Sequence, residues 1–384
     1  MKRVLSNFLI YLKRLDILLV LLCLFACFFS AYMLYSMVQN EVSPFVFERH
    51  YKMQTAMAVM GLFASLIIAA VNYKYISKFW YISAAAGISL MLLLFTPLGV
   101  GPQGSEEINW LNFGFTTVQP SEFLKFFYVI TFSTHLAKVG KRMNRIPHLV
   151  LLMAHAACPM LLLLSRGDFG TTLVVILITF TMLFIAGLWW RYVAVILALV
   201  PVAAFVMWNY VFKAYHKLRI LVLIDEEVRE AEMLNFFNQQ HRSLIAIGSG
   251  ELTGRGLFGG EYIYVPEYQT DFIFSYIGMT LGFVGCVSVL SLIMFICIRI
   301  LMNCLISKDA LGKYMCVGVF AMFLYNTIIN VGMTLAVMPV IGQPLPLIGA
   351  GGSSVLSYFM AIGLVLSVRA HKDKKYHMFY TEKE

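Results

Sequence analysis

The carboxylate of Asp271 lies where a polar segment meets a predicted membrane helix, a position at which charged residues are uncommon. Asp271 ends the run Pro266-Glu267-Tyr268-Gln269-Thr270-Asp271, which closes a long polar segment and leads directly into an apolar stretch. A charge at the boundary between water and lipid is energetically costly, so an ionisable group at that depth is a functional candidate. The sequence therefore directs attention to Asp271 and to whatever surrounds it.

A glycine-rich run in the same polar segment has two interpretations. Residues 243–257 read Ser-Leu-Ile-Ala-Ile-Gly-Ser-Gly-Glu-Leu-Thr-Gly-Arg-Gly-Leu, and the apolar start predicts a short helix on the membrane surface. Exposed backbone amides of the glycine turn, together with Arg255, could hold a phosphate group. Alternatively, the glycines serve a loop that needs left-handed backbone.

Further charged residues stand at predicted helix starts. In Gln119-Pro120-Ser121-Glu122-Phe123-Leu124-Lys125 the proline and the serine are typical of a helix entry. Glu122 and Lys125 are three residues apart and share a helix face, so they can form an ion pair. That pair is either structural or part of a pocket wall. Asp168, which precedes Gly170-Thr171-Thr172, is predicted to cap the next helix.

The elements that position these residues are predicted to be membrane helices. Of the 384 residues, 60% are hydrophobic and 13% are charged, whereas soluble domains carry roughly 25% charged residues. Because a bilayer core needs roughly 20 apolar residues per helix, the sequence predicts an all-α polytopic membrane protein of about ten transmembrane helices. Their expected positions are 16–37, 54–72, 79–99, 122–138, 147–164, 170–189, 192–212, 272–302, 314–338 and 354–369.

Charge patterning predicts the orientation of the chain. Most of the 29 Lys and Arg residues fall in alternate connections, and the basic side of a membrane protein is cytoplasmic, which predicts that both termini are cytoplasmic. Basic cytoplasmic loops also explain the net charge of +9 better than nucleic-acid binding does. The other side carries three polar segments, 101–121, 213–270 and 339–353. Because irregular backbone at membrane depth must be buried or line a wet cavity, we expect them to converge on one outward-facing pocket.

The eight histidines form no metal triad, and the seven cysteines lie in or beside apolar runs, where free packing thiols are expected.

Six short motifs follow one another along the chain. They are Trp110-Leu111-Asn112-Phe113-Gly114, Gln119 to Lys125, Asp168-Phe169-Gly170-Thr171, Ser243 to Gly250, Pro266-Glu267 with Thr270-Asp271-Phe272-Ile273-Phe274, and Gly351-Gly352-Ser353-Ser354. In this order and spacing they resemble the SEDS family of bacterial peptidoglycan polymerases, the group of RodA, FtsW and SpoVE. The run Gln343-Pro344-Leu345-Pro346 is more similar to RodA than to FtsW.

The chain departs from the family pattern at a few positions. The family usually has Arg where this chain has Asn109, and Pro where it has Gly167. It usually has acidic residues in place of Met279 and Thr280, and Ser-Tyr in place of Gly349-Ala350. These departures concern details of the pocket and do not involve Asp271.

The resemblance implies a function. Residues 1–384 are expected to form a single SEDS-type membrane domain. The implied activity is that of a glycosyltransferase that polymerises lipid II at the outer face of the bacterial cytoplasmic membrane, for cell elongation and shape. Its large outer loop, 213–271, carries the family's essential aspartate, which maps onto Asp271. The expected substrate-binding residues are Trp110, Glu122, Lys125, Arg219, Arg242, Arg255 and Glu267.

The implied chemistry needs a base and a counter-charge. Asp271 would take the proton of the acceptor hydroxyl, and Lys217, Arg219, Arg242 and Arg255 would hold the leaving diphosphate. A divalent cation could share that task, although the sequence requires no cofactor.

The resemblance also implies partners: lipid II, a class B penicillin-binding protein (a transpeptidase) and other membrane proteins of the elongation complex, but no nucleic acid. The alternative function is a lipid II flippase. Such carriers usually show internal repeats around a midplane site, and the sequence shows no convincing repeat.

Overall fold

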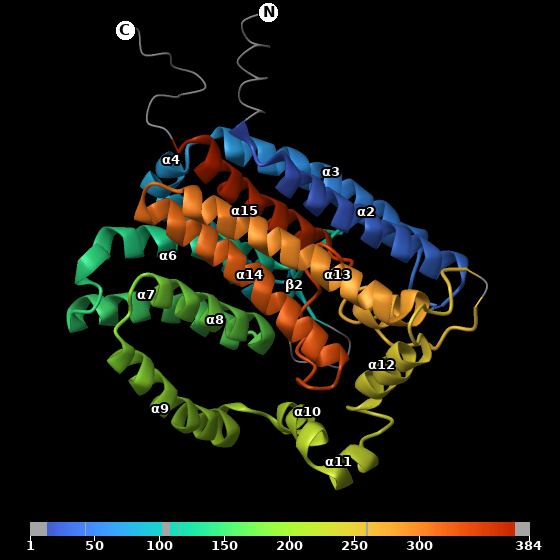
Figure 1. The fold of residues 1–384 in the computed structure, drawn as a ribbon. Coiled ribbons are helices and arrows are strands. Elements are labelled where there is room, and N and C mark those ends of the chain that lie inside the picture. The colour runs from blue at the N-terminus through green and yellow to red at the C-terminus, as the bar shows by residue number, and fades with distance from the viewer. Residues whose placement is uncertain (1–13, 43, 102–107, 115, 259, 373–384) are drawn as a thin grey trace, which may run out of the picture.

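The computed structural model describes residues 14–42, 44–101, 108–114, 116–258 and 260–372. The terminal residues, which the charge pattern predicts to be cytoplasmic, lie outside this described part. Within it the chain forms a bundle of long helices that run roughly side by side, with α15 among its neighbours rather than at an edge (Figure 1).

The predicted transmembrane helices are present. Seven helices are long and apolar enough to cross a membrane, counted over the described residues. They are α2 (Ile17–Gln39), α3 (Glu48–Ala70), α7 (Ile146–Leu164), α9 with its π-helical end (Trp190–Val211), α13 (Ile273–Ile306), α14 (Ala310–Thr334) and α15 (Gly352–Ala370).

Three further helices fill the remaining predicted positions. Two of them, Trp80–Phe95 (α5, Trp80–Leu92, with a 3-10 turn) and α8 (Phe169–Ile185), are apolar but shorter. The third is α6 (Pro120–Val139), which carries Glu122, Lys125 and Lys138. The expectation of an all-α polytopic membrane protein is therefore confirmed.

Short elements connect the long helices. Helix α4 (Tyr73–Lys78) links α3 to α5, while α10 (Ala214–Ile224), α11 (Glu226–Ala231) and α12 (Asn238–Ser249) make up most of the large polar loop. Strands β1 (Gly99–Val100), β2 (Trp110–Asn112) and β3 (Thr117–Val118) form a small antiparallel sheet in the order β1-β2-β3, just before α6. The sequence did not predict this sheet or α4.

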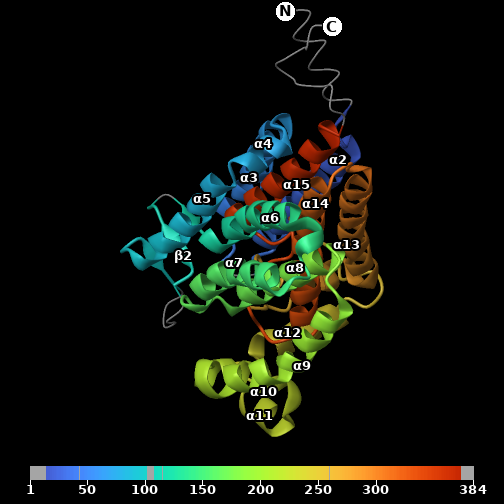
Figure 2. The same cartoon turned by 90° about the vertical axis from the view of Figure 1, so that its left-hand side faces the viewer.

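The core centres on α15, which packs against α3, α6, α13 and α14. Most of its side chains are buried, whereas α9 has no buried residue. Figures 1 and 2 show α9, α10 and α11 together at one edge of the molecule, apart from the helices around α15. All seven cysteines are free thiols, as predicted.

An ionic cluster ties three helices together at the basic end of the bundle. Asp16, buried at the start of α2, accepts hydrogen bonds from Arg299 Nη2 at 2.6 Å and from Asn303 Nδ2 at 2.7 Å, both on α13. Arg369 of α15 lies 3.6 Å from Asp16 and donates to Asn303 Oδ1 at 3.0 Å. Because a buried charge is stable only when paired, these contacts fix α2, α13 and α15 relative to one another.

The glycine-rich run docks against a break in α13. Gly282 has φ +65° and interrupts the helix. The amides of Arg255 and Gly256 donate to the carbonyls of Met279 and Thr280 at 2.9 and 3.0 Å, and the amides of Phe283 and Val284 donate to Glu251 and Leu252. Each segment thus provides hydrogen-bond partners for backbone groups of the other segment that would otherwise be unpaired.

This docking supports the structural interpretation of the glycine run, while a phosphate-binding role of the Arg255 side chain stays a prediction. Gly254 and Gly256 adopt the left-handed backbone, with φ of +82° and +93°. Their conformation and the bonded amides match the structural interpretation, and these two amides are already used by α13. The expectation that the turn exposes amides for a phosphate is wrong for Arg255 and Gly256.

We expect Gly250→Ala to destabilise the protein, because a Cβ there would lie 1.9 Å from the carbonyl oxygen of Gly278 in α13. Overpacking of this kind costs about 1–3 kcal/mol. Gly248→Ala is the matched control, because a Cβ at Gly248 meets nothing within 4 Å. Thermal unfolding of the two purified variants in detergent measures the difference, and equal midpoints would contradict the close contact between α12 and α13.

Candidate functional site

Asp271 lies in a tight turn directly before α13. The amides of Thr270 and Phe272 both donate to the carbonyl of Glu267, at 3.2 and 3.1 Å, and Glu267 itself has φ +59°. The Glu267 carboxylate accepts from Gln269 Nε2 at 3.2 Å and from Thr270 Oγ1 at 3.1 Å. The turn is therefore held by its own residues, and it presents Asp271, which is half-buried, where the helix begins.

One buried amide on α14 holds this turn in place. Asn330 Nδ2 donates to the carbonyl of Asp271 at 2.7 Å and to the carbonyl of Gln343 at 2.8 Å. Gly342, with φ +63°, passes the Asp271 carboxylate, and a Cβ at Gly342 would lie 3.6 Å from Asp271 Oδ2. Asn330 thus joins the second and third polar segments beside the carboxylate.

The surroundings raise the pKa of Asp271 to about 7. Burial is the main cause, because it disfavours the charged form, and the negative charges of Glu267 and Glu122 add to it. A carboxyl group with such a pKa exchanges a proton near neutral pH, which suits a general base or acid.

Glu122 and Lys125 form the ion pair that their spacing allows. Lys125 Nζ lies 2.7 Å from Glu122 Oε1, and both side chains are essentially inaccessible to solvent. Ser357 of α15 donates its hydroxyl to the Glu122 carbonyl at 2.6 Å, and the Lys125 ammonium lies 6.0 Å from the Tyr358 ring. The pair is thus buried where α6 meets α15, and its role, structural or substrate-binding, stays a prediction.

The three polar segments meet, as expected from the sequence. The Gln119 amide donates to Ser353 Oγ at 3.1 Å, which joins the first segment to the third. The Ala350 amide donates to the Gln269 carbonyl at 2.7 Å, which joins the third segment to the second. Their convergence is thereby confirmed, while the pocket between them stays a prediction.

The basic residues of the large loop are held by backbone carbonyls. Arg219 Nη1 donates to Val340 at 3.2 Å, Arg242 Nη1 donates to Tyr264 at 3.2 Å, and Arg255 Nη1 donates to Glu261 at 2.9 Å. Lys217 Nζ lies 5.7 Å from the Trp208 ring centroid. These contacts orient the guanidinium groups, and their role toward a phosphate stays a prediction.

Two further predicted residues have clear positions. Trp110 is half-buried in β2, where it pairs with Val100 of β1. Asp168 caps α8, as predicted, and accepts from the Thr171 amide at 2.9 Å. Burial raises the pKa of Asp168, and its hydrogen bonds, chiefly that from Thr171, counteract this effect only in part.

Sequence reasoning missed the polar side chains of α14 and the third segment. Asn330 holds the Asp271 turn, and Gln343 Nε2 reaches Thr171 Oγ1 of α8 at 3.3 Å. The available signal was the pair Asn326 and Asn330, four residues apart within an apolar span, because polar side chains inside membrane helices usually bond across helices.

Several oxygens near Asp271 are buried without a partner among the described residues. They include Glu122 Oε2, Asn330 Oδ1 and Gln343 Oε1, which come from α6, α14 and the third segment. Buried polar atoms of this kind are unusual in a folded protein and often mark functional sites. The region can therefore bind polar groups as well as exchange a proton at Asp271.

The sequence matches a known family over most of its length. Residues 12–374 match the family of FtsW, RodA and SpoVE, which is described as cell cycle proteins. The chain is 30% identical over 324 residues to the peptidoglycan glycosyltransferase MrdB of Escherichia coli, covering 82% of this chain and 84% of MrdB. It is 26% identical over 368 residues to the probable peptidoglycan glycosyltransferase FtsW of Trichlorobacter lovleyi, covering 94% of both.

Solved structures show the same fold. A structure described as showing structural coordination of polymerization and crosslinking by a peptidoglycan synthase complex is similar with a TM-score of 0.77 and 25% identity, covering 94% of this chain and 99% of that chain. The rod shape determining protein RodA of Thermus thermophilus is similar with a TM-score of 0.67 and 24% identity, covering 93% of this chain and 97% of that chain.

Proposed function

Because this chain belongs to the FtsW, RodA and SpoVE family, we propose that it is a peptidoglycan glycosyltransferase that polymerises lipid II at the outer face of the cytoplasmic membrane. Its similarity to MrdB and to the RodA structure supports a role in cell elongation and shape. The observation that carries the proposal is Asp271, a half-buried carboxylate at the start of a membrane helix with a pKa of about 7.

In the proposed reaction Asp271 is the general base. Its carboxylate takes the proton from the acceptor sugar hydroxyl, whose oxygen then bonds to the anomeric carbon of the donor sugar. The bond from that carbon to the diphosphate breaks, and undecaprenyl diphosphate leaves with the electron pair. Proton transfer by a positioned side chain is worth about 10²–10⁴ in rate.

The leaving diphosphate needs positive charge. Arg219, Arg242 and Arg255 come from the same loop as Asp271, and a guanidinium group has five N–H donors in a planar fork that fits phosphate oxygens. The carbonyl contacts of these arginines would orient them toward such a group. We propose Lys217 as a fourth cation, and Trp110, Glu122, Lys125 and Glu267 as further groups that line the substrate site.

The proposed topology follows from charge and from the family. Arg299, Arg369 and Lys138 lie at the basic end of the bundle, which we place in the cytoplasm, so that Asp271 faces the outside. The single membrane domain would carry its base in the loop 213–271. Similarity to a synthase complex that coordinates polymerization and crosslinking supports a partner transpeptidase, a class B penicillin-binding protein.

Replacing the base tests the proposal most directly. We expect Asp271→Asn to lower lipid II polymerisation by about 10²–10⁴-fold, because an amide cannot accept the proton. The measurement is the yield of glycan strands on a gel after incubation of the reconstituted protein with lipid II, with and without the transpeptidase. Glu261→Gln, at an exposed carboxylate of the same loop, is the control and should keep full activity. A folded Asp271→Asn protein that still makes long glycan would defeat the assignment.

The pKa of Asp271 predicts the pH dependence of the reaction. A base must be deprotonated, so the rate should fall as the pH drops through about 7 and level off above it. Glu267→Gln removes one negative neighbour, which lowers the pKa of Asp271. The fall in rate should therefore occur at lower pH in this variant. Initial rates between pH 5 and 9 measure the shift. A fall in rate that moves to higher pH in Glu267→Gln would contradict the prediction.

Asn330 is proposed as a positioning residue for the Asp271 turn. Asn330→Ala removes both hydrogen bonds to the carbonyls of Asp271 and Gln343, and a base misplaced by about 1 Å can cost on the order of 10²-fold. Asn326→Ala is the matched control, because Asn326 Nδ2 donates within its own helix to Met322. Polymerisation rates and thermal midpoints of both variants check this, and equal losses of rate would argue against a specific role for Asn330.

A further inference from the structure

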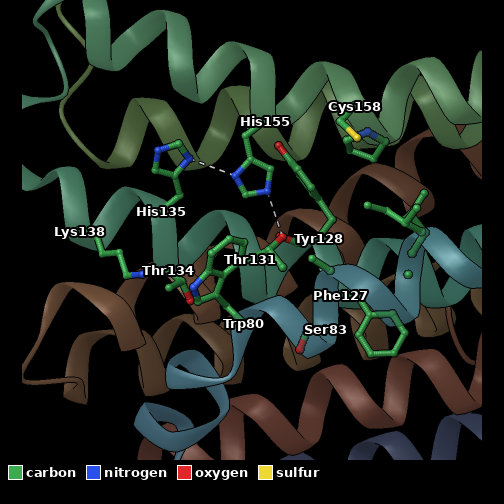
Figure 3. A pocket seen from close by; sticks show the side chains of 15 residues that line it. Trp80, Ser83, Phe127, Tyr128, Thr131, Thr134, His135, Lys138, His155 and Cys158 are labelled. Atoms are coloured by element: carbon green, nitrogen blue, oxygen red, sulfur yellow. Dashed lines mark hydrogen bonds between the residues drawn. The ribbon is translucent and has the colours of Figure 1, made fainter.

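A cavity of about 500 Å³ lies between α5, α6 and α7, on helices that do not carry Asp271. Figure 3 shows Trp80 and Ser83 of α5, Phe127 to Lys138 of α6, and His155 and Cys158 of α7 around it. Its volume falls within the range of roughly 300–1,000 Å³ typical of ligand pockets. Helix α6 forms the floor, because α5 and α7 both pack on α6 and touch each other only slightly.

The walls of the cavity suit a hydrocarbon chain. They include Ala84, Ile88, Leu124, Phe127 and Pro159. Neighbouring residues on α5 and α7 that point away from the bundle are apolar and more than half exposed, with Ile82 at 57% and Leu161 at 64%. Exposed apolar side chains on membrane helices face lipid, so the cavity is a groove in the lipid-facing surface.

Three polar residues inside the groove form a chain of hydrogen bonds. Thr131 Oγ1 donates to the Tyr128 carbonyl at 3.1 Å, so its oxygen accepts from His155 Nε2 at 3.2 Å. With that tautomer His155 Nδ1 accepts, and His135 Nδ1 donates to it at 3.1 Å. These bonds satisfy the Thr131 hydroxyl and both His155 nitrogens, while the Tyr128 and Thr134 hydroxyls bond to Thr179 and Ser77. Most polar atoms of the lining are thus already paired, and the remaining wall is mainly apolar.

Positive charge stands at one end of the groove. Lys138, in the last turn of α6, is exposed, and its ammonium lies 5.3 Å from the Trp80 ring. Lys141 and Arg142 follow in the same connection. A phosphate at this end would meet a cation next to an aromatic ring, the combination typical of the membrane interface.

We propose that this groove binds an anionic phospholipid, with one acyl chain between α5 and α7 and the phosphate on Lys138. From Lys138 to Leu124 the floor extends over 14 residue-to-residue steps of α6, roughly 21 Å at 1.5 Å per step. That length exceeds half of a bilayer core of about 30 Å, so it accommodates a chain from one leaflet. A transmembrane helix, about 10–12 Å wide with its side chains, is too bulky for this cavity.

Native mass spectrometry of the purified full-length protein tests the proposal. The protein in detergent is titrated with 1-palmitoyl-2-oleoyl phosphatidylglycerol or with the matching phosphatidylcholine, and bound lipid is counted. We expect tighter binding of phosphatidylglycerol, by about fivefold for the contribution of one lysine. Because the readout is lipid binding, it is independent of whether the protein polymerises lipid II.

Two pairs of variants localise the binding. Ala84→Trp fills the groove and should remove the tightest phosphatidylglycerol, whereas Ala85→Trp places the same side chain at an exposed neighbour outside the groove and should not. Lys138→Gln should abolish the preference for phosphatidylglycerol, whereas Lys141→Gln, at an exposed lysine outside the lining, should keep it. Lys138 is exposed, so its variant folds even if Ala84→Trp does not.

The proposal fails on any of three results. Equal binding of the two lipids by the unmodified protein would overturn it. So would the same loss of lipid in Ala84→Trp and Ala85→Trp, or a phosphatidylglycerol preference that survives in Lys138→Gln.

Discussion

The arrangement of the site depends on a single buried amide. Asn330 lies within α14, where water is scarce, and its two donated hydrogen bonds reach carbonyls 59 and 13 residues away along the chain. Those carbonyls belong to the Asp271 turn and to the segment before α15, neither of which is helical there. Irregular backbone at this depth persists only when protein atoms satisfy it. Asp271 is thus positioned by the hydrogen bond that its backbone carbonyl accepts from Asn330.

The Glu122–Lys125 pair complements this arrangement. An ammonium group close to Asp271 would lower its pKa if the charge were free to act. Lys125 is already bonded to Glu122 at 2.7 Å, and Glu122 contributes negative charge toward Asp271. Lys125 is thus neutralised within α6, and the charges that act on Asp271 are the negative ones of Glu267 and Glu122. A residue with a neutral side chain at position 122 would leave Lys125 buried and uncompensated, which is strongly unfavourable.

The sequence predicted the helices well because their signal is local. Every predicted span coincides with a helix of the described chain, since long apolar runs identify membrane helices by composition alone. It also predicted the capping role of Asp168, whose partner Thr171 is three residues away. What it could not predict depends on distant partners. The break at Gly282 is stabilised by Glu251 and Leu252, and the role of Asn330 requires knowing where Gln343 lies.

The distribution of charged contacts bears on the choice between a polymerase and a carrier. At the basic end Asp16 holds Arg299 and Arg369, which fastens α2, α13 and α15 to one another. The polar groups around Asp271 lie where α13 and α15 begin, at the other end of these two helices. A carrier must open its site alternately to both faces of the membrane, and it usually does so by moving one group of helices against another around a midplane site. Opening between α2, α13 and α15 would break a buried ion pair, a cost that chemistry at one face of the membrane does not incur.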